Sequence, residues 1–146
     1  MMSLHKQVAI ELCTTIDDNG QMEYNKIQQN GFLYKKGSLD VLTFEEMADD
    51  NSVIKNLITI QSDRVNIKRS GNVTMNQQFQ ERQTTENVLK HPYGSIHMET
   101  FTQSILYSPL KAREDGSLHI AYTVKLNGQE ERQHKIDVTI KEEDMT

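Results

Sequence analysis

The chain has 146 residues, close to the commonest size of a single domain, so we expect one hydrophobic core over residues 1–146. Hydrophobic residues make up 36% and charged residues 25%, a balance that excludes a disordered chain. The formal net charge of -5 disfavours a nucleic-acid-binding surface, because such surfaces neutralise phosphates with clustered Lys and Arg.

The sequence also indicates the cellular compartment of the protein and the state of its cysteine. No stretch approaches the roughly 20 apolar residues that span a bilayer, and the N-terminus lacks the pattern of a signal peptide. The single cysteine, Cys13, has no partner for an intrachain disulfide. We therefore expect a cytoplasmic protein with no membrane partner, in which Cys13 is an inert side chain because no histidine lies near it.

The N-terminal part of the chain alternates with the two-residue period of a β-strand. Over residues 4–16 the apolar side chains fall on even positions, and a polar turn over 17–20 ends in Gly20. Residues 21–36 predict one interrupted strand, with a bulge or tight bend at Asn30 and Gly31.

The middle of the chain predicts four more strands, over residues 39–44, 52–61, 64–70 and 73–79. An acidic, polar connection over 45–51 separates the first two of these. The stretch from 83 to 92 is polar and is interpreted as a connection.

The C-terminal part gives the strongest local signal. A strand is expected over residues 96–107, followed by a turn region. The segments 118–126 and 134–140 alternate on either side of Asn127 and Gly128, which predicts a β-hairpin with a type I′ turn. A loose, charged tail is expected over about 141–146.

These elements add up to about eight or nine strands without an amphipathic helix, which is typical of a β-sandwich or an up-and-down barrel. Short, sequential links favour the single antiparallel up-and-down β-barrel. Closure of the barrel would also remove exposed sheet edges.

Several segments support this fold through a resemblance. They are Leu42, Thr43, Phe44, Glu45 and Glu46; Arg69, Ser70 and Gly71 followed by Met75, Asn76, Gln77 and Phe79; Pro92, Tyr93 and Gly94; and Gly116 through Ile120, Ala121 and Tyr122. In order and spacing they resemble the YwiB-like family of small proteins from low-GC Gram-positive bacteria. The resemblance implies a calycin-like, lipocalin-like barrel of unknown function. The Gly-x-Trp signature of secreted lipocalins is absent, because the chain has no Trp.

Arg69 is the first candidate for a ligand-binding residue, because alternation places it on the same face as Val65 and Ile67. In the functional interpretation it binds a ligand carboxylate or phosphate inside the barrel, with Tyr93 or Tyr122 as hydroxyl partners. In the structural interpretation it reaches water at the strand end or pairs with a glutamate.

Histidines and methionines give weaker candidates. His97 and Glu99 share one face and would supply two ligands of a metal site, but no third ligand can be named, so we assign no metal or other cofactor. His134 is interpreted as a hydrogen-bonded histidine of the core or rim. Four methionines at strand spacing fill the core or line an adaptable cavity: Met22, Met47, Met75 and Met98.

No catalytic residue is assigned. The chain has no Gly-x-Ser-x-Gly elbow, no phosphate-binding loop and no dinucleotide fingerprint, and its paired carboxylates lie in predicted turns.

Two hypotheses about function follow. The first is a barrel that binds a small amphipathic or anionic ligand near Arg69, Phe79, Met98 and Tyr122. The alternative is a protein–protein interaction module with a filled barrel, either a homodimer or bound to a basic partner that the acidic segments 45–51 and 130–131 attract.

Overall fold

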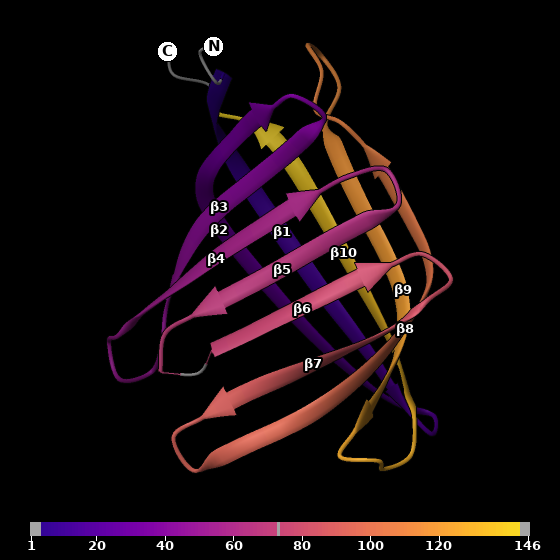
Figure 1. Ribbon diagram of the computed structural model, residues 1–146. Helices are drawn as coiled ribbons and strands as arrows, with labels where there is room; N and C mark the ends of the chain where they lie inside the picture. The colour runs from indigo at the N-terminus through magenta and orange to yellow at the C-terminus, as the bar shows by residue number, and fades with distance from the viewer. Residues whose placement is uncertain (1–3, 73, 144–146) are drawn as a thin grey trace.

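The computed structural model describes residues 4–72 and 74–143, which form β-strands joined by turns and loops (Figure 1). In chain order the strands are β1 (Leu4–Asp18), β2 (Gln21–Lys36), β3 (Leu39–Met47), β4 (Val53–Ile60), β5 (Arg64–Ser70), β6 (Thr74–Gln80), β7 (Thr84–His91), β8 (Gly94–Ser108), β9 (Gly116–Leu126) and β10 (Arg132–Glu142). Each strand pairs antiparallel with the next, and β10 pairs with β1, so the sheet closes into a barrel. The predicted all-β antiparallel barrel is confirmed.

The described residues form ten strands rather than the predicted eight or nine, because the polar stretch predicted as a connection forms β7. Asn87 of β7 is buried, and β7 contributes no residue to the apolar core of the described chain. A strand with a polar inner face shows no hydrophobic period, so sequence reasoning missed it.

Two boundaries also differ. The strand β10 continues through Glu142, so residues 141 and 142 belong to the sheet and not to a loose tail. Residues 144–146 of the predicted tail, and Val73 of the predicted strand over 73–79, lie outside the described residues. Within the described part of the chain, no helix has the length and apolar character needed to cross a membrane.

The core fills the barrel with the inward side chains of alternating positions. Val8 and Ile10 of β1, Phe79 of β6, and Leu118 and Ile120 of β9 are each at most 3% exposed. Full burial of such a side chain contributes about 1.5–3 kcal/mol to folding. The alternation that predicted the strands is therefore also what builds the core.

The loop between β8 and β9 lies at the same end of the barrel as the start of β1 and the end of β10 (Figure 1). Leu110 of this loop is buried in the core. A Cβ atom on Gly116 would come within 2.9 Å of the Leu110 backbone nitrogen, so a glycine is needed for this close approach.

The predicted hairpin between β9 and β10 is confirmed. Asn127 and Gly128 both have positive φ, at 49° and 73°, as a type I′ turn requires.

The strand ladder is incomplete at two places. The strand β2 pairs with β1 throughout, but with β3 only from Gly31 to Lys36, so residues 21–30 have a strand on one edge only within the described chain. We call this divergence the β2–β3 fork. The strands β6 and β7 share only the pairs Thr74 with Lys90 and Met75 with Leu89; we call the remainder, residues 76–80 and 84–88, the β6–β7 seam.

Candidate functional site

A groove of about 830 Å³ lies at the β2–β3 fork and extends over β3, β4 and β5. We call it the fork groove. It is lined by Gln29, Asn30, Gly31, Phe32, Thr43, Phe44, Glu45, Glu46, Met47, Val53, Lys55, Asn56, Leu57, Lys68 and Ser70. This volume is within the range of sites that bind small molecules or peptide side chains.

The fork begins at Gly31, where β2 and β3 are in close contact. A Cβ atom on Gly31 would lie 2.1 Å from the Thr43 carbonyl oxygen and 2.8 Å from Cδ1 of Ile10. Only glycine fits between these atoms, and the β2–β3 ladder ends at this residue. The β1–β2 register runs through Asn30 and Gly31 without a shift, so the interruption and bulge predicted within residues 21–36 are wrong, and Gly31 instead marks the end of the β2–β3 ladder.

The groove presents apolar side chains to solvent. Phe32, Met47, Val53 and Leu57 are all large hydrophobic residues that stay exposed, with Met47 at 70%. Contiguous exposed apolar surface often marks a site of protein or ligand binding. Alternation along the strand puts Val53 and Leu57 on one face, but no local pattern brings them beside Phe32 and Met47.

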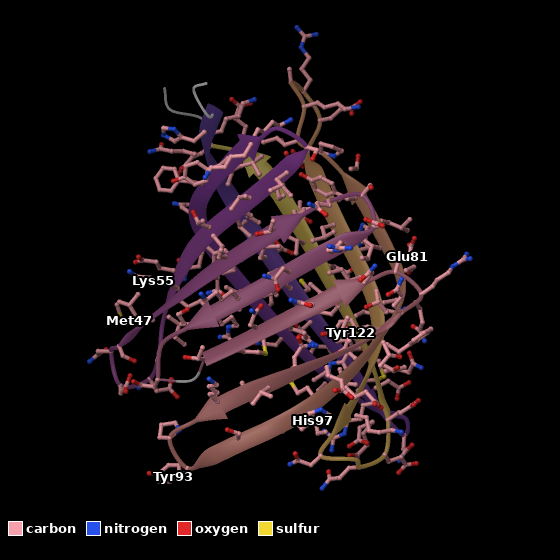
Figure 2. All side chains as sticks on the ribbon, in the orientation of Figure 1. Met47, Lys55, Glu81, Tyr93, His97 and Tyr122 are labelled. Carbon is pink, nitrogen blue, oxygen red and sulfur yellow. The ribbon has the colours of Figure 1, made fainter. Side chains whose placement is uncertain are left out.

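Two lysines add positive charge. Lys55 and Lys68 point outward from β4 and β5, and Figure 2 shows Lys55 on the outside of the barrel near Met47. Neither lysine forms an ion pair within the described residues. Glu45 faces Lys55 across the β3–β4 ladder, but the two do not come within ion-pair distance. The groove thus offers cationic groups that are available to an acidic partner.

The Arg69 side chain is bound within the chain. It lies on the inward face at the end of β5 and is 39% exposed, and its Nη2 donates to Oε2 of Glu46 at 3.0 Å. Nδ2 of buried Asn56 donates to the same oxygen at 2.7 Å. Glu46 lies on the groove wall. These contacts match the structural interpretation, in which Arg69 pairs with a glutamate, and they join two of the segments that carry the family resemblance.

Phe79, Met98 and Tyr122 are core residues. They are 0%, 6% and 3% exposed, and the rings of Phe79 and Tyr122 meet edge to face with centroids 4.8 Å apart. Burial raises the pKa of the Tyr122 phenol. Tyr122 also lies against the half-buried ring of His134, at 5.1 Å. The backbone of His134 pairs with β1 and β9, but its ring has no hydrogen-bond partner among the described residues, so the side-chain hydrogen bond expected for it is not found there.

Tyr93 lies far from any interior site, contrary to its proposed role beside Arg69. It occupies the tip of the β7–β8 hairpin, where it is 94% exposed, and Figure 2 shows it at the far end of that hairpin from Tyr122. Tyr93 lies in the turn before Gly94, whose φ of 143° is favoured by glycine. A residue in so tight a turn between two strands projects from the barrel end and not into it.

The β6–β7 seam is closed by polar side chains. The Gln78 N–H donates to Oδ1 of Asn87 at 3.2 Å, and the Thr85 hydroxyl donates to the Gln78 carbonyl at 2.5 Å. Buried Gln77 donates from Nε2 to the Thr100 hydroxyl at 3.1 Å. Side chains therefore replace the backbone ladder here.

Two buried polar atoms of this region have no hydrogen-bond partner within the described residues: Nδ2 of Asn87 and Oγ1 of Thr102. Buried polar atoms are rarely left unpaired, so each of these two atoms is a place where a small polar molecule, water included, would find a hydrogen-bond partner.

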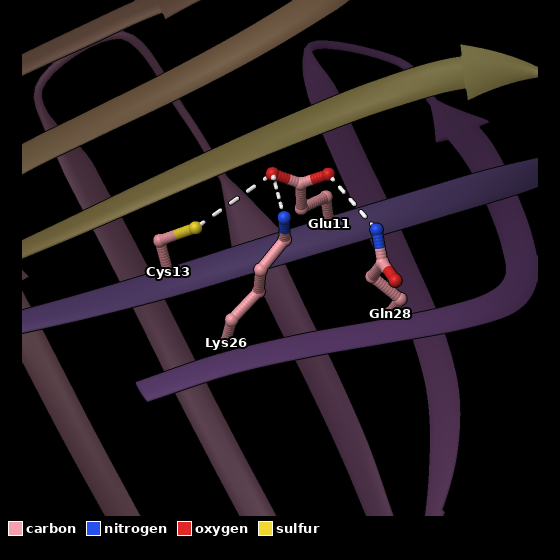
Figure 3. Close-up of polar contacts among 4 residues, drawn as sticks. All are labelled: Glu11, Cys13, Lys26 and Gln28. Atoms are coloured by element: carbon pink, nitrogen blue, oxygen red, sulfur yellow. Dashed lines mark hydrogen bonds and ion pairs between the residues drawn. The ribbon is translucent and has the colours of Figure 1, made fainter. Parts of the chain in front are cut away.

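Cys13 and Glu11 belong to a surface cluster on β1 and β2 (Figure 3). The Glu11 carboxylate accepts from Gln28 Nε2 at 3.2 Å and lies 3.5 Å from Lys26 Nζ, while the Cys13 thiol is 3.8 Å from Glu11 Oε1. Burial and the negative charge of Glu11 raise the pKa of the Cys13 thiol. A protonated thiol is a poor nucleophile.

The histidine and carboxylate pair of β8 is not part of a metal-binding group. His97 lies 3.8 Å from Glu86, and Glu99 lies 4.0 Å from Lys125. Among residues 4–72 and 74–143, no group of three or more His, Cys, Asp or Glu side chains is placed to hold a metal ion.

Comparisons with known proteins extend over nearly the whole chain. The family described as "Domain of unknown function (DUF1934)" matches residues 10–138. The "Uncharacterized beta-barrel protein YwiB" of Bacillus subtilis (strain 168) is 29% identical over 138 residues, covering 94% of this chain and 95% of that protein. The crystal structure of the ywiB protein from Bacillus subtilis superposes with a TM-score of 0.82 and 25% identity, covering 96% of this chain and 94% of that one.

Proposed function

The chain belongs to the DUF1934 family of unknown function, and we propose that it is a cytoplasmic protein-interaction module whose binding surface is the fork groove. The observation that carries this proposal concerns the described residues: the edge of residues 21–30 has no strand beside it there, and it leads into a groove with exposed apolar side chains and with lysines that form no ion pair among these residues. An unpaired strand edge beside such a groove is the usual docking site for an extended segment of another chain.

The packing of the barrel supports an outer binding surface. Phe79 and Tyr122, which the ligand hypothesis placed around a pocket, are core residues in contact with each other. Arg69 already has a carboxylate partner in Glu46. The polar and charged groups that remain available at the fork are on the outside.

The groove also defines the charge of the partner. Two carboxylates of the acidic segment over 45–51 already have partners within the chain. Glu46 pairs with Arg69, and Asp50 accepts hydrogen bonds from Ser52 and Asn72. Among the described residues, Lys55, Lys68 and Glu45 are the charged groups of the groove without an ion-pair partner, which leaves a net positive charge. The proposal therefore replaces the basic partner with an acidic one.

Site-specific photocrosslinking in the protein's own host tests this function. A photoreactive residue at Leu57, on the groove, is compared with one at Leu106, which is 64% exposed on β8 and outside the groove. We expect a reproducible protein adduct at 57 that is absent at 106 and is reduced by Lys55→Glu with Lys68→Glu. Equal adducts at both positions, or none at either, would contradict the proposal.

A second candidate is the binding of a small amphipathic or anionic molecule inside a lipocalin-like barrel, near Arg69, Phe79, Met98 and Tyr122. The unpartnered polar atoms of Asn87 and Thr102 favour it. Native mass spectrometry of protein purified from its host would then show a retained small molecule, and Thr102→Val would lose it. A bare protein mass for the wild type would count against this candidate.

A further inference from the structure

We propose that the fork is occupied by a second copy of the chain. The two β2 edges pair antiparallel about a two-fold axis, and the acidic β1–β2 turn of each copy enters the fork groove of the other. This inference rests on the proposed function, because it names the partner of the same surface.

The free edge of β2 is an ordered template for a strand. Residues 21–30 pair with β1 along their whole length, and Lys26 and Gln28 are further tied to Glu11 (Figure 3). On the other edge every second residue directs its N–H and C=O away from β1, with no strand to receive them in the described chain.

This edge also lacks the usual protection against pairing. Natural edge strands are commonly interrupted by proline, bulges or several charges. Residues 21–30 contain no proline or glycine, and their only charged residues are Glu23 and Lys26. A second copy of the same edge is always present at the protein's own concentration.

Symmetry restricts the register. Residues that face each other across an antiparallel pair lie on the same side of the sheet, so a symmetric pair is centred on a single residue of each copy. A centre at Glu23 or at Lys26 would place like charges opposite each other. A centre at Asn25 avoids facing like charges. It pairs residues 21–29 of one copy with residues 29–21 of the other. Tyr24 then faces the partner's Lys26. A centre at Tyr24 would pair only residues 21–27.

The same register brings opposite charges together outside the strand. The β1–β2 turn directly precedes β2, so pairing about Asn25 carries the partner's turn to residues 30–33, where the fork groove begins. Asp17 and Asp18 end β1 directly before this turn and lie opposite Met22 and Gln21 of their own hairpin. The groove that receives the turn bears Lys55 and Lys68, and the two-fold axis creates this contact twice.

A hydrogen bond and an ion pair within the chain fix the conformation of the β1–β2 turn. Oδ1 of Asp17 accepts the N–H of Gly20 at 2.8 Å, and Oδ1 of Asp18 lies 3.7 Å from Nε of Arg132. Both aspartates are partly exposed and keep carboxylate oxygens for a second contact. Opposite charge on the two surfaces is the reason to favour a second copy over an unrelated chain.

Sedimentation velocity of the full chain tests the dimer. We expect the wild type to dimerise and Lys55→Glu with Lys68→Glu to weaken association at least about tenfold, since each substitution turns an attraction into a repulsion. Lys111→Glu with Arg113→Glu, two exposed residues of the loop between β8 and β9, makes the same change in net charge away from the groove and should leave association unchanged. Association of the wild type should also weaken as salt rises.

A disulfide test reports the register. In a Cys13→Ser background, Asn25→Cys should form an interchain disulfide under mild oxidation, because the symmetric partner residues lie within disulfide distance. Leu106→Cys is the control and should stay reduced. A dimer that survives Lys55→Glu with Lys68→Glu and gives no disulfide at position 25 would overturn the inference.

The outcomes separate this inference from the proposed function. A monomeric wild type that still gives a protein adduct from position 57 in its host would overturn the second copy as partner and retain the interaction surface. A monomeric wild type with no such adduct would overturn both.

Discussion

The β2–β3 fork and the β6–β7 seam are both places where the backbone ladder of the barrel stops, but the molecule completes them differently. At the seam, Asn87 and Thr85 supply hydrogen bonds to Gln78 in place of a strand. Nearby, the Glu81 carboxylate accepts the Ile105 N–H at 2.9 Å, next to a register shift in β8. At the fork, residues 21–30 keep a free edge and a groove opens beside it.

The difference shows that two interruptions of the ladder can serve different roles, one in the stability of the barrel and the other in binding. Asn87, which closes the seam from within, is buried, and an unmet hydrogen bond at such a position costs free energy of folding. An open gap whose groups face water carries no such penalty and remains available to another chain. We therefore expect the seam to control stability and the open part of the fork to control association.

The largest effect should come from the one point where the fork is closely packed. In Gly31→Ala the new Cβ meets the Thr43 carbonyl oxygen, a backbone atom that cannot rotate away. We expect a loss of about 3 kcal/mol in the free energy of unfolding, measured by urea denaturation. Asn30→Ala, next to it and exposed, should change stability by less than about 0.5 kcal/mol. Equal stability of both variants would contradict the close contact.

A matched pair of substitutions compares the seam with the fork directly. Asn87→Leu leaves the Gln78 N–H without its acceptor, and we expect it to lower the free energy of unfolding by about 1–3 kcal/mol. Asn25→Leu makes the same chemical change at an exposed position on the free edge of β2, where we expect less than about 0.5 kcal/mol. A larger loss at 25 than at 87 would reverse the comparison.

The smallest effect concerns pH. Burial, helped by the positive charge of Arg132, lowers the pKa of His134 from 6.5. The unfolded chain then binds a proton more readily than the folded one, so this histidine costs no stability above about pH 6.5 and lowers stability as pH falls below it.

His134→Phe removes that cost and keeps a ring beside Tyr122. Between about pH 7 and about pH 5 the stability of the variant should fall less than that of the wild type, by under about 1 kcal/mol, in parallel urea titrations. Identical pH dependence of both proteins would show that His134 does not titrate differently on folding.

The amino-acid sequence determined the strands and the class of fold. The even positions of β1 and the hairpin at Asn127 and Gly128 were readable because each signal is local: a two-residue period, or two residues that accept positive φ. Arg69 was placed on the correct face by the same period, and the buried positions of Phe79 and Tyr122 followed from it.

Tertiary structure alone decided the candidate site. The fork groove joins Phe32, Met47 and Lys68, which belong to different strands, and no local pattern relates them. The sequence did not reveal that Glu46 is the partner of Arg69, or that β7 is a strand with a polar inner face, for the same reason. Alternation fixes which side of a strand a residue faces, but only the pairing of distant segments decides where a ladder stops, and the binding surface proposed for this protein lies at such a stop.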